Sequence, residues 1–215
     1  MTRTFARSIL GCALLGAAVA FTGLAGVATA DDNNRAQPRA EVGQKAPNFT
    51  LKCTDGKEHS LQKYLDQGKI VVLEWFNPEC PFVVKHYDLH PTMATLSKKY
   101  AEHNVVWLAI NSGREGQQGA GLEKNKDYKK NWNIAYPILM DMSGDVGRMY
   151  NARTTPHMFI IHSNGTLMYD GAIDNNRSPR ELGDVNYVDN ALRAILAGET
   201  VEPATTRPYG CSVKY

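Results

Sequence analysis

The sequence predicts an α/β fold: a central mixed, mainly parallel sheet with helices on both faces, and an N-terminal β-hairpin as an extension. Two observations lead to this prediction. Three short apolar runs alternate with helical patterns along the middle of the chain, and two other stretches show the alternating pattern of antiparallel hairpins. Alternating strands and helices are typical of parallel strands joined by crossover helices, while a terminal hairpin supplies an antiparallel edge.

The three apolar runs are the expected inner strands. They read "KIVVLEWF" at 69–76, "NVVWLAIN" at 104–111 and "YPILMD" at 136–141. The first two are apolar almost throughout, which indicates strands that are buried on both faces.

Helical patterns follow each of these strands and recur near the end of the chain, at 82–102, 122–132, 144–151 and 186–198. Pro91 is expected to break or kink the first helix near His90, because proline removes a backbone donor. Asn151 is expected to end the third helix in the left-handed conformation. Gly198 ends the last, amphipathic helix.

Two turn signals mark the hairpins. Asp55-Gly56 lies inside the alternating stretch 48–61, and Asn164-Gly165 lies inside 155–171, where it is typical of a type I′ turn. Beyond the last helix, residues 199–215 are rich in proline and predict an extended tail.

The chain begins with the pattern of a secretory signal peptide, residues 1–30. Arg3 and Arg7 precede a long uncharged run, and Ala28-Thr29-Ala30 is a small-x-small cleavage site. The apolar run is long enough, at about 20 residues, to serve instead as an uncleaved anchor. Residues 31–41 are expected to be a disordered spacer, 42–198 the folded domain and 199–215 the tail. The mature protein is expected to be exported, periplasmic or secreted, with no membrane segment after cleavage.

Charge argues against nucleic acid as a partner. The whole chain has 24 basic and 22 acidic residues, and the two leader arginines account for the excess. The mature chain therefore has no net basic character to attract phosphate.

The cysteine count points to redox chemistry. Of the four cysteines, Cys12 falls in the leader, so the mature chain keeps Cys53, Cys80 and Cys211. An odd number in an exported protein leaves at least one thiol free or bridged to another chain. Cys80 stands between a buried strand and a helix that starts with Pro81, and helix N-termini favour thiolates.

The junction "KIVVLEWFNPECPF" and the stretch "TTPHMFIIHSNGTLMYDGAID" resemble the redoxin, AhpC/TSA-like branch of the thioredoxin superfamily. The resemblance covers about Val42 to Gly198, and "PYGCSVKY" at the end is similar to tails of exported redoxin-like proteins. It implies a thioredoxin-like fold and a cis peptide before Pro156. It also implies that Cys80 is the redox thiol, facing a loop at Thr155-Pro156 that pairs with the substrate backbone.

Further site residues follow from the same resemblance. Glu74 matches a buried acid that helps to move protons. Independently of the resemblance, Trp75 and Phe76 are expected beside Cys80 as substrate contacts, and a role as core residues fits them equally well. The second cysteine of a C-x-x-C pair is replaced by Val83. Against peroxiredoxin-like members, Asn77 stands where a threonine is kept, and Leu73 where a proline is kept.

A single thiol needs a partner to complete a catalytic cycle. Cys211 is the favoured resolving cysteine, because its tail is long enough to return over the site. Cys53 is the other candidate, although its place in a hairpin strand favours a packing role. A Cys80–Cys211 bridge would also fit a purely structural role.

The predicted function is therefore a redoxin-type thiol–disulfide oxidoreductase, with protein disulfides as substrates and a thiol reductant as electron donor. Two alternatives stay open: a peroxiredoxin-like antioxidant that reduces peroxides, and a non-catalytic module that binds a partner or a metal. No cofactor is expected. His86 and His90 stand four residues apart, a spacing that can bind zinc, and His157 with Cys80 would suit copper, but a solvated or capping role is favoured for the first two.

Overall fold

The structure is a computed structural model and describes residues 39–215. The predicted signal peptide (1–30) and nearly all of the predicted spacer (31–41) lie outside the described residues. Among the helices of 39–215, none has the length and apolar character needed to cross a membrane.

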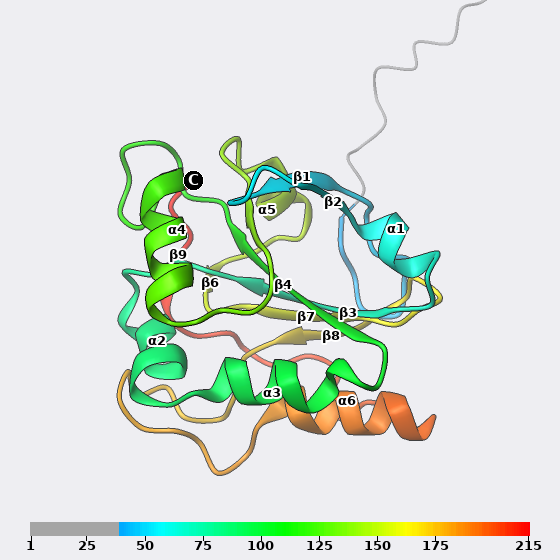
Figure 1. Cartoon of the computed structure of the whole chain (residues 1–215). Coiled ribbons are helices and arrows are strands. Elements are labelled where there is room, and N and C mark those ends of the chain that lie inside the picture. Colours follow the sequence, from blue (N-terminus) through cyan, green and yellow to red (C-terminus); the bar gives the residue numbers. More distant parts are fainter. Residues whose placement is uncertain (1–38) are drawn as a thin grey trace, which may run out of the picture. The chain divides into compact units, whose positions relative to one another are not determined.

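Alternating strands and helices run through the described chain (Figure 1). The strands are β1 (Thr50–Cys53), β2 (Glu58–Ser60), β3 (Ile70–Trp75), β4 (Val105–Asn111), β5 (Ile138–Met140), β6 (Thr154–Thr155), β7 (Met158–Ile161), β8 (Leu167–Gly171) and β9 (Cys211–Ser212). The helices are α1 (Leu61–Leu65), α2 (Pro81–Val84), α3 (Thr92–Ala101), α4 (Leu122–Asn131), α5 (Asp145–Met149) and α6 (Tyr187–Ala197).

The central sheet of residues 39–215 has seven strands in the order β2-β1-β5-β4-β3-β7-β8. It is mixed, as predicted, but the expectation of a mainly parallel sheet is wrong. Only β3–β4 and β4–β5 are parallel, and the other four pairings are antiparallel. Both hairpins join the one sheet, so the N-terminal hairpin is part of it and not an extension.

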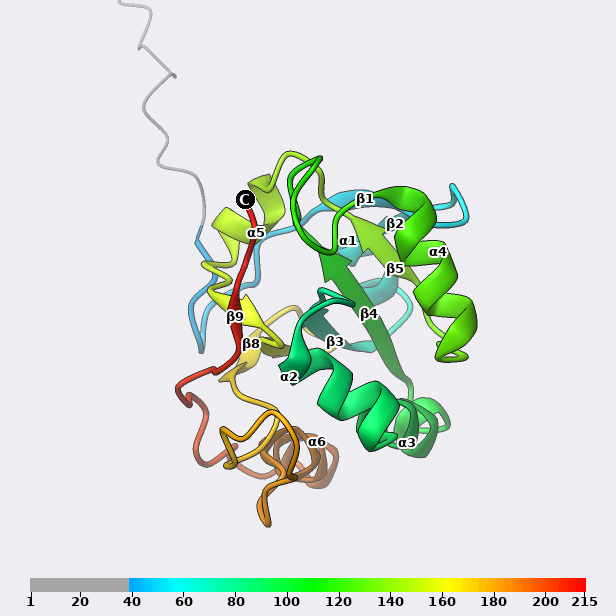
Figure 2. The ribbon, with the colours of Figure 1, turned by 90° about the vertical axis from the view of Figure 1, so that its left-hand side faces the viewer.

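Helices cover both faces of the sheet (Figures 1 and 2). One face packs against α3 and α6 through residues such as Leu96 and Leu192. The other packs against α1 and α5 through residues such as Leu61 and Val146. Because successive side chains of a strand point to opposite faces, each strand of the interior contributes to both cores.

The predicted break near Pro91 is present, with one addition. After α2 the chain makes a π-helical turn, Lys85–Leu89, before α3 begins at Thr92. Asn151 is left-handed, at φ 51°, as predicted. The turn between β7 and β8 is not the predicted type I′ turn at Asn164-Gly165, because only Gly165 of that pair has positive φ. The Gly165 N–H bonds to the His162 carbonyl, so Ser163 and Asn164 are the central residues, and the register shifts between Ile160 and Ile161.

Helix α6 begins at a side-chain cap. The Asn186 side chain accepts a hydrogen bond from the Asp189 backbone N–H at 2.9 Å, and left-handed Gly198 ends the helix.

We expect Asn186→Ala to lower the free energy of unfolding by about 1 kcal/mol, because one helix donor loses its partner. Denaturant unfolding measures this, with Asn190→Ala inside the same helix as the control. An equal loss in both variants would contradict the capping role.

Candidate active site

Cys80 lies where the carboxyl end of β3 meets the first turn of α2. Its backbone N–H bonds to the Asn77 carbonyl at 3.1 Å, which closes the connecting turn. Cys80 is the residue that precedes the helix, and Pro81 takes the first helical position. The thiol has no exposed surface and donates to the Thr155 carbonyl oxygen, with Sγ 3.0 Å away.

The Thr155–Pro156 peptide bond is cis, as the family resemblance implied. Thr155 belongs to the short strand β6, and its carbonyl oxygen is the group that faces Cys80. The structure therefore brings the Thr155-Pro156 turn and Cys80 together.

The tail returns to this turn as strand β9 (red in Figure 2), which begins with Cys211. Strand β9 pairs antiparallel with β6, with Cys211 opposite Thr155. Cys80 bonds to the carbonyl of the same Thr155, so this residue holds the two cysteines next to one another. Burial, followed by the neighbouring Cys80 thiol, raises the pKa of Cys211 to about 12, so the thiol of Cys211 stays protonated at neutral pH.

Gly210 allows the tail to approach this closely. Its φ is +132°, and a β-carbon placed on it would lie 2.1 Å from the Thr155 carbonyl oxygen. Any larger residue would push the tail away from the Thr155-Pro156 turn, so this position requires glycine.

Cys53 and Trp75 lie on the other face of the sheet. Both belong to the core that packs against α1 and α5, whereas Cys80 belongs to the opposite core. Trp75 is fully buried, and its indole N–H donates to Ser112 Oγ at 3.0 Å. Cys53 is therefore not placed to resolve Cys80, and Trp75 is not placed to contact a substrate at the thiol.

Phe76 and Glu74 share the face of Cys80. Phe76 is in the same core and meets the Tyr87 ring edge-on at 5.5 Å. Glu74 is fully buried, and its Oε2 accepts hydrogen bonds from the Tyr87 hydroxyl (2.8 Å) and the Trp107 indole (3.0 Å), with Tyr136 at 3.4 Å.

The Glu74 carboxyl is only partly compensated for its burial. Its second oxygen, Oε1, has no hydrogen-bond partner within residues 39–215. Burial raises the pKa of Glu74 from 4.5 to about 7, and the three donors oppose this shift without cancelling it. A carboxyl of this kind exchanges a proton near neutral pH.

The glycine-rich loop after β4 lies against the turn that carries Cys80. Asn77 Nδ2 donates to the Gln118 carbonyl at 3.1 Å, and Asn77 Oδ1 accepts from the Glu79 backbone N–H at 2.9 Å. Glu79 in turn accepts from the Gly119 backbone N–H and pairs with Lys124 at 2.7 Å. These contacts hold the loop against the turn that carries Cys80.

The histidines have structural partners. His90 Nε2 contacts the Arg180 carbonyl at 2.9 Å, and His157 Nε2 contacts Asp170 at 2.6 Å. His86 is fully buried, so the expectation of a solvated or capping role is wrong for it. The π-helical turn is the reason, because it directs Lys85 and His86, adjacent in sequence, into the interior. Residues 39–215 contain no group of three metal-binding side chains.

No site role was predicted from the sequence for Lys85, Asp174 and Tyr209, and His86 was not grouped with them. The four form one buried cluster. A signal was present, because Tyr209 stands two residues before Cys211 and Lys85 five residues after Cys80.

Comparison with known proteins gives the family. The AhpC/TSA family model matches residues 42–170. A thiol-disulfide oxidoreductase ResA of Bacillus thuringiensis is 26% identical over 157 residues, which are 73% of this chain and 81% of the relative. ResA of Geobacillus kaustophilus is 31% identical, over 59% of this chain and 66% of its own.

Solved structures agree on the fold. A hypothetical protein from Sinorhizobium meliloti superposes with a TM-score of 0.73 at 26% identity, covering 81% of this chain and 94% of that one. A DsbE-like thiol:disulfide interchange protein from Chlorobium tepidum has a TM-score of 0.56 at 21% identity, over 74% and 97% of the chains. The predicted thioredoxin-like fold is thus confirmed, and the chain belongs to the AhpC/TSA family.

Proposed function

We propose that this protein is a redoxin-type thiol–disulfide oxidoreductase in which Cys80 is the nucleophile and Cys211 resolves it. The observation that carries the proposal is that both cysteines lie at the cis Thr155–Pro156 turn: the Cys80 thiol donates to the Thr155 carbonyl, and Cys211 pairs with Thr155 through β9. The relatives that are named thiol-disulfide oxidoreductases support the same class of reaction.

The reaction is a pair of thiol–disulfide exchanges. The Cys80 thiolate attacks one sulfur of a substrate disulfide, forms a mixed disulfide and releases the other sulfur as a thiolate, which takes a proton. The Cys211 thiol then loses its proton and attacks the Cys80 sulfur, which releases the substrate's second thiol. The substrate gains two electrons, and the protein is left with a Cys80–Cys211 disulfide that a thiol reductant reduces.

Three neighbouring groups have roles in this proposal. Thr155 and Pro156 present a backbone edge to an extended substrate, as in β-strand addition. Phe76 borders the buried side of the thiol. Glu74, whose carboxyl titrates near neutral pH, holds a proton on the same face of the sheet as Cys80.

Asn77 argues for disulfide exchange over peroxide reduction. In peroxiredoxin-like proteins a threonine at this position orients peroxide. Here the Asn77 amide donates one of its two N–H groups to the Gln118 carbonyl and accepts from the Glu79 N–H, so it is engaged with the loop and the connecting turn.

The proposed substrates are protein disulfides, and the proposed donor is a thiol reductant. We further propose export to an oxidising compartment such as the periplasm. The leader pattern of residues 1–30 supports export, and a cysteine pair that cycles between thiols and a disulfide suits that compartment.

Single substitutions test the cysteine roles. Cys80→Ser is expected to abolish reduction of a model peptide disulfide, because the nucleophile is gone. Cys211→Ser is expected to stop after the first exchange, so mass spectrometry should find the substrate bound to Cys80. Cys53→Ser, on the other face, serves as the control and should retain wild-type turnover. Full turnover by Cys211→Ser would disprove the resolving role. If reduced wild type and reduced Cys211→Ser melt at the same temperature, a loss of turnover in the variant is due to resolution and not to a loss of stability.

Glu74 predicts a pH-dependent stability. Its folded-state pKa lies above its unfolded value, so its contribution is complete below about pH 4.5 and is lost as pH rises through about 7. The free energy of unfolding of wild type relative to Glu74→Gln should therefore fall by roughly 3 kcal/mol between pH 4 and pH 8. Denaturant unfolding at both pH values measures this.

Glu79→Gln is the matched control for that experiment. The hydrogen bond from Lys124 lowers the pKa of Glu79, so its contribution appears above its unfolded pKa and is lost as pH falls. Its pH trend should have the opposite sign and be small, since the pair is exposed. A Glu74→Gln difference that stays flat with pH would contradict a raised Glu74 pKa.

A further inference from the structure

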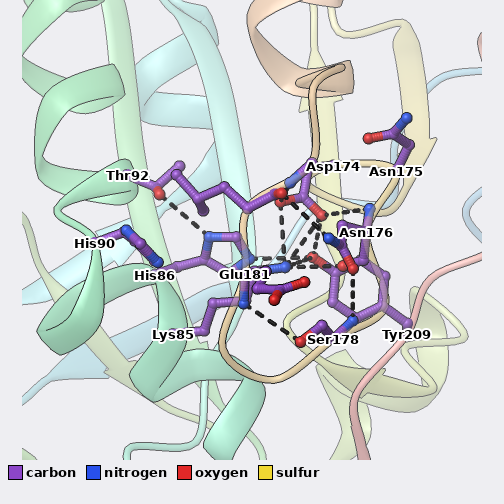
Figure 3. A network of polar contacts seen from close by, with 12 residues as sticks. Lys85, His86, His90, Thr92, Asp174, Asn175, Asn176, Ser178, Glu181 and Tyr209 are labelled. Atoms are coloured by element: carbon purple, nitrogen blue, oxygen red, sulfur yellow. Dashed lines mark hydrogen bonds and ion pairs between the residues drawn. The ribbon is translucent and has the colours of Figure 1, made fainter.

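Tyr209 anchors the tail in a buried polar cluster (Figure 3). Its hydroxyl donates to Asp174 Oδ1, and it lies 3.1 Å from Lys85 Nζ and 3.1 Å from His86 Nε2. Tyr209 is 4% exposed, whereas Lys85 and His86 have no exposed surface. We call Lys85, His86 and Asp174 the latch.

The Tyr209 hydroxyl uses its full bonding capacity in the latch. A phenol has one donor and accepts through two lone pairs, and here it donates to the Asp174 carboxylate and accepts from Lys85 and His86. Burial lowers the pKa of His86 to about 3, so the ring is neutral. Because the one phenolic proton of Tyr209 goes to Asp174, Nε2 of His86 must carry the N–H that faces Tyr209, and Nδ1 accepts from the Thr92 hydroxyl 3.2 Å away.

The latch joins the tail to the helical segment that carries Cys80. Lys85 and His86 lie on the π-helical turn that continues α2, and Asp174 lies in the chain after β8. Lys85 also donates to the Asn176 carbonyl at 2.8 Å and pairs with Asp174 Oδ2 at 3.2 Å. Tyr209 stands two residues before Cys211, so a fixed Tyr209 fixes the start of β9.

This cluster is better suited to fixing the position of the tail than to stabilising the fold. Buried ion pairs are often no more stabilising than apolar residues of the same volume, because their desolvation is costly. An apolar plug could also sit against Phe82, whose ring is 5.9 Å from that of Tyr209. An apolar contact would tolerate several positions of the ring, whereas the charged latch binds the Tyr209 hydroxyl at one position. The latch therefore fixes the position of Cys211, two residues further along the tail.

We propose that the latch is a binding site for the Tyr209 hydroxyl and that it positions Cys211 against Cys80 by docking the tail. This inference rests on the proposed function, because it assigns the latch a part in resolution. Tyr209, Lys85, His86 and Asp174 are positioning residues that act through β9. With the latch engaged, the tail occupies the β6 edge and Cys80 is covered.

The test is the effective concentration of Cys211 at Cys80, measured from the equilibrium of the Cys80–Cys211 disulfide with reduced and oxidised glutathione. Tyr209→Phe keeps the ring and removes the hydroxyl. It is expected to lower the effective concentration about tenfold or more, the scale of hydrogen bonds to charged partners. The alkylation rate of Cys80, followed by peptide mass spectrometry on the reduced protein, should rise as the tail undocks.

Tyr215→Phe is the matched control. Tyr215 is a second tail tyrosine, whose hydroxyl donates to the Ala152 carbonyl at 2.8 Å, away from the latch. It should change either measurement by about fivefold at most, and by less than Tyr209→Phe does, since its bond is to a neutral group. Gly210→Ala, which displaces β9 directly, should change both measurements in the same direction as Tyr209→Phe.

Two results would overturn the latch: wild-type behaviour of Tyr209→Phe in both measurements, or equal effects of Tyr209→Phe and Tyr215→Phe. Failure of the proposed function looks different. In that case the wild type forms no Cys80–Cys211 disulfide at any glutathione ratio, and Cys80 alkylation alone still decides whether the latch docks the tail.

Discussion

The backbone pairing of β9 with β6 beside the cis Thr155–Pro156 peptide is the contact on which the site depends. Each strand has only two residues, so the pairing contributes few hydrogen bonds of its own. It is held from both sides: Tyr209 is fixed in the latch before Cys211, and the Val213 N–H bonds to the Arg153 carbonyl after it. Between these anchors Gly210 brings the backbone against Thr155, and Cys211 lies opposite the residue whose carbonyl accepts from Cys80.

A second constraint is the alternation of side chains along β3. Glu74 and Phe76 point to the face that contains Cys80, and Trp75 points to the other. A slip of one residue would exchange these faces. It would put the indole under the thiol and the carboxyl in the opposite core. The pairing of Glu74 with Ala109 on β4 and with Met158 on β7 holds this register from both neighbours.

Much of this could be predicted from local patterns. The strands, the break before Thr92, the left-handed Asn151 and the strand-end position of Cys80 all follow from periodicity and turn chemistry. The return of Cys211 followed from chain length and the need for a second thiol. The side of the sheet that Trp75 faces could not be predicted. A strand that is buried on both faces has no alternation of polar and apolar residues to distinguish one core from the other.

Long-range features escaped prediction for a related reason. The order of strands depends on the edge of the sheet to which each hairpin pairs. No local sequence pattern indicates that β1 pairs with β5. Lys85 and His86 were expected on an ordinary helix, where adjacent positions diverge by about 100°. The π-helical turn buries both, and it is stabilised by Tyr209 and Asp174, which are more than 85 residues away.

The tail also constrains the order of events in the proposed cycle. A docked tail covers Cys80 and occupies the β6 edge, the edge that an extended substrate would need. Substrate entry therefore requires undocking, while resolution requires Cys211 to be docked again. After the first exchange the substrate strand must leave β6 while still bound to the Cys80 sulfur. A C-x-x-C site, whose two thiols share one helix, has no such step. Here Val83 stands where that second thiol would be, so the same segment that completes the chemistry also limits access to it.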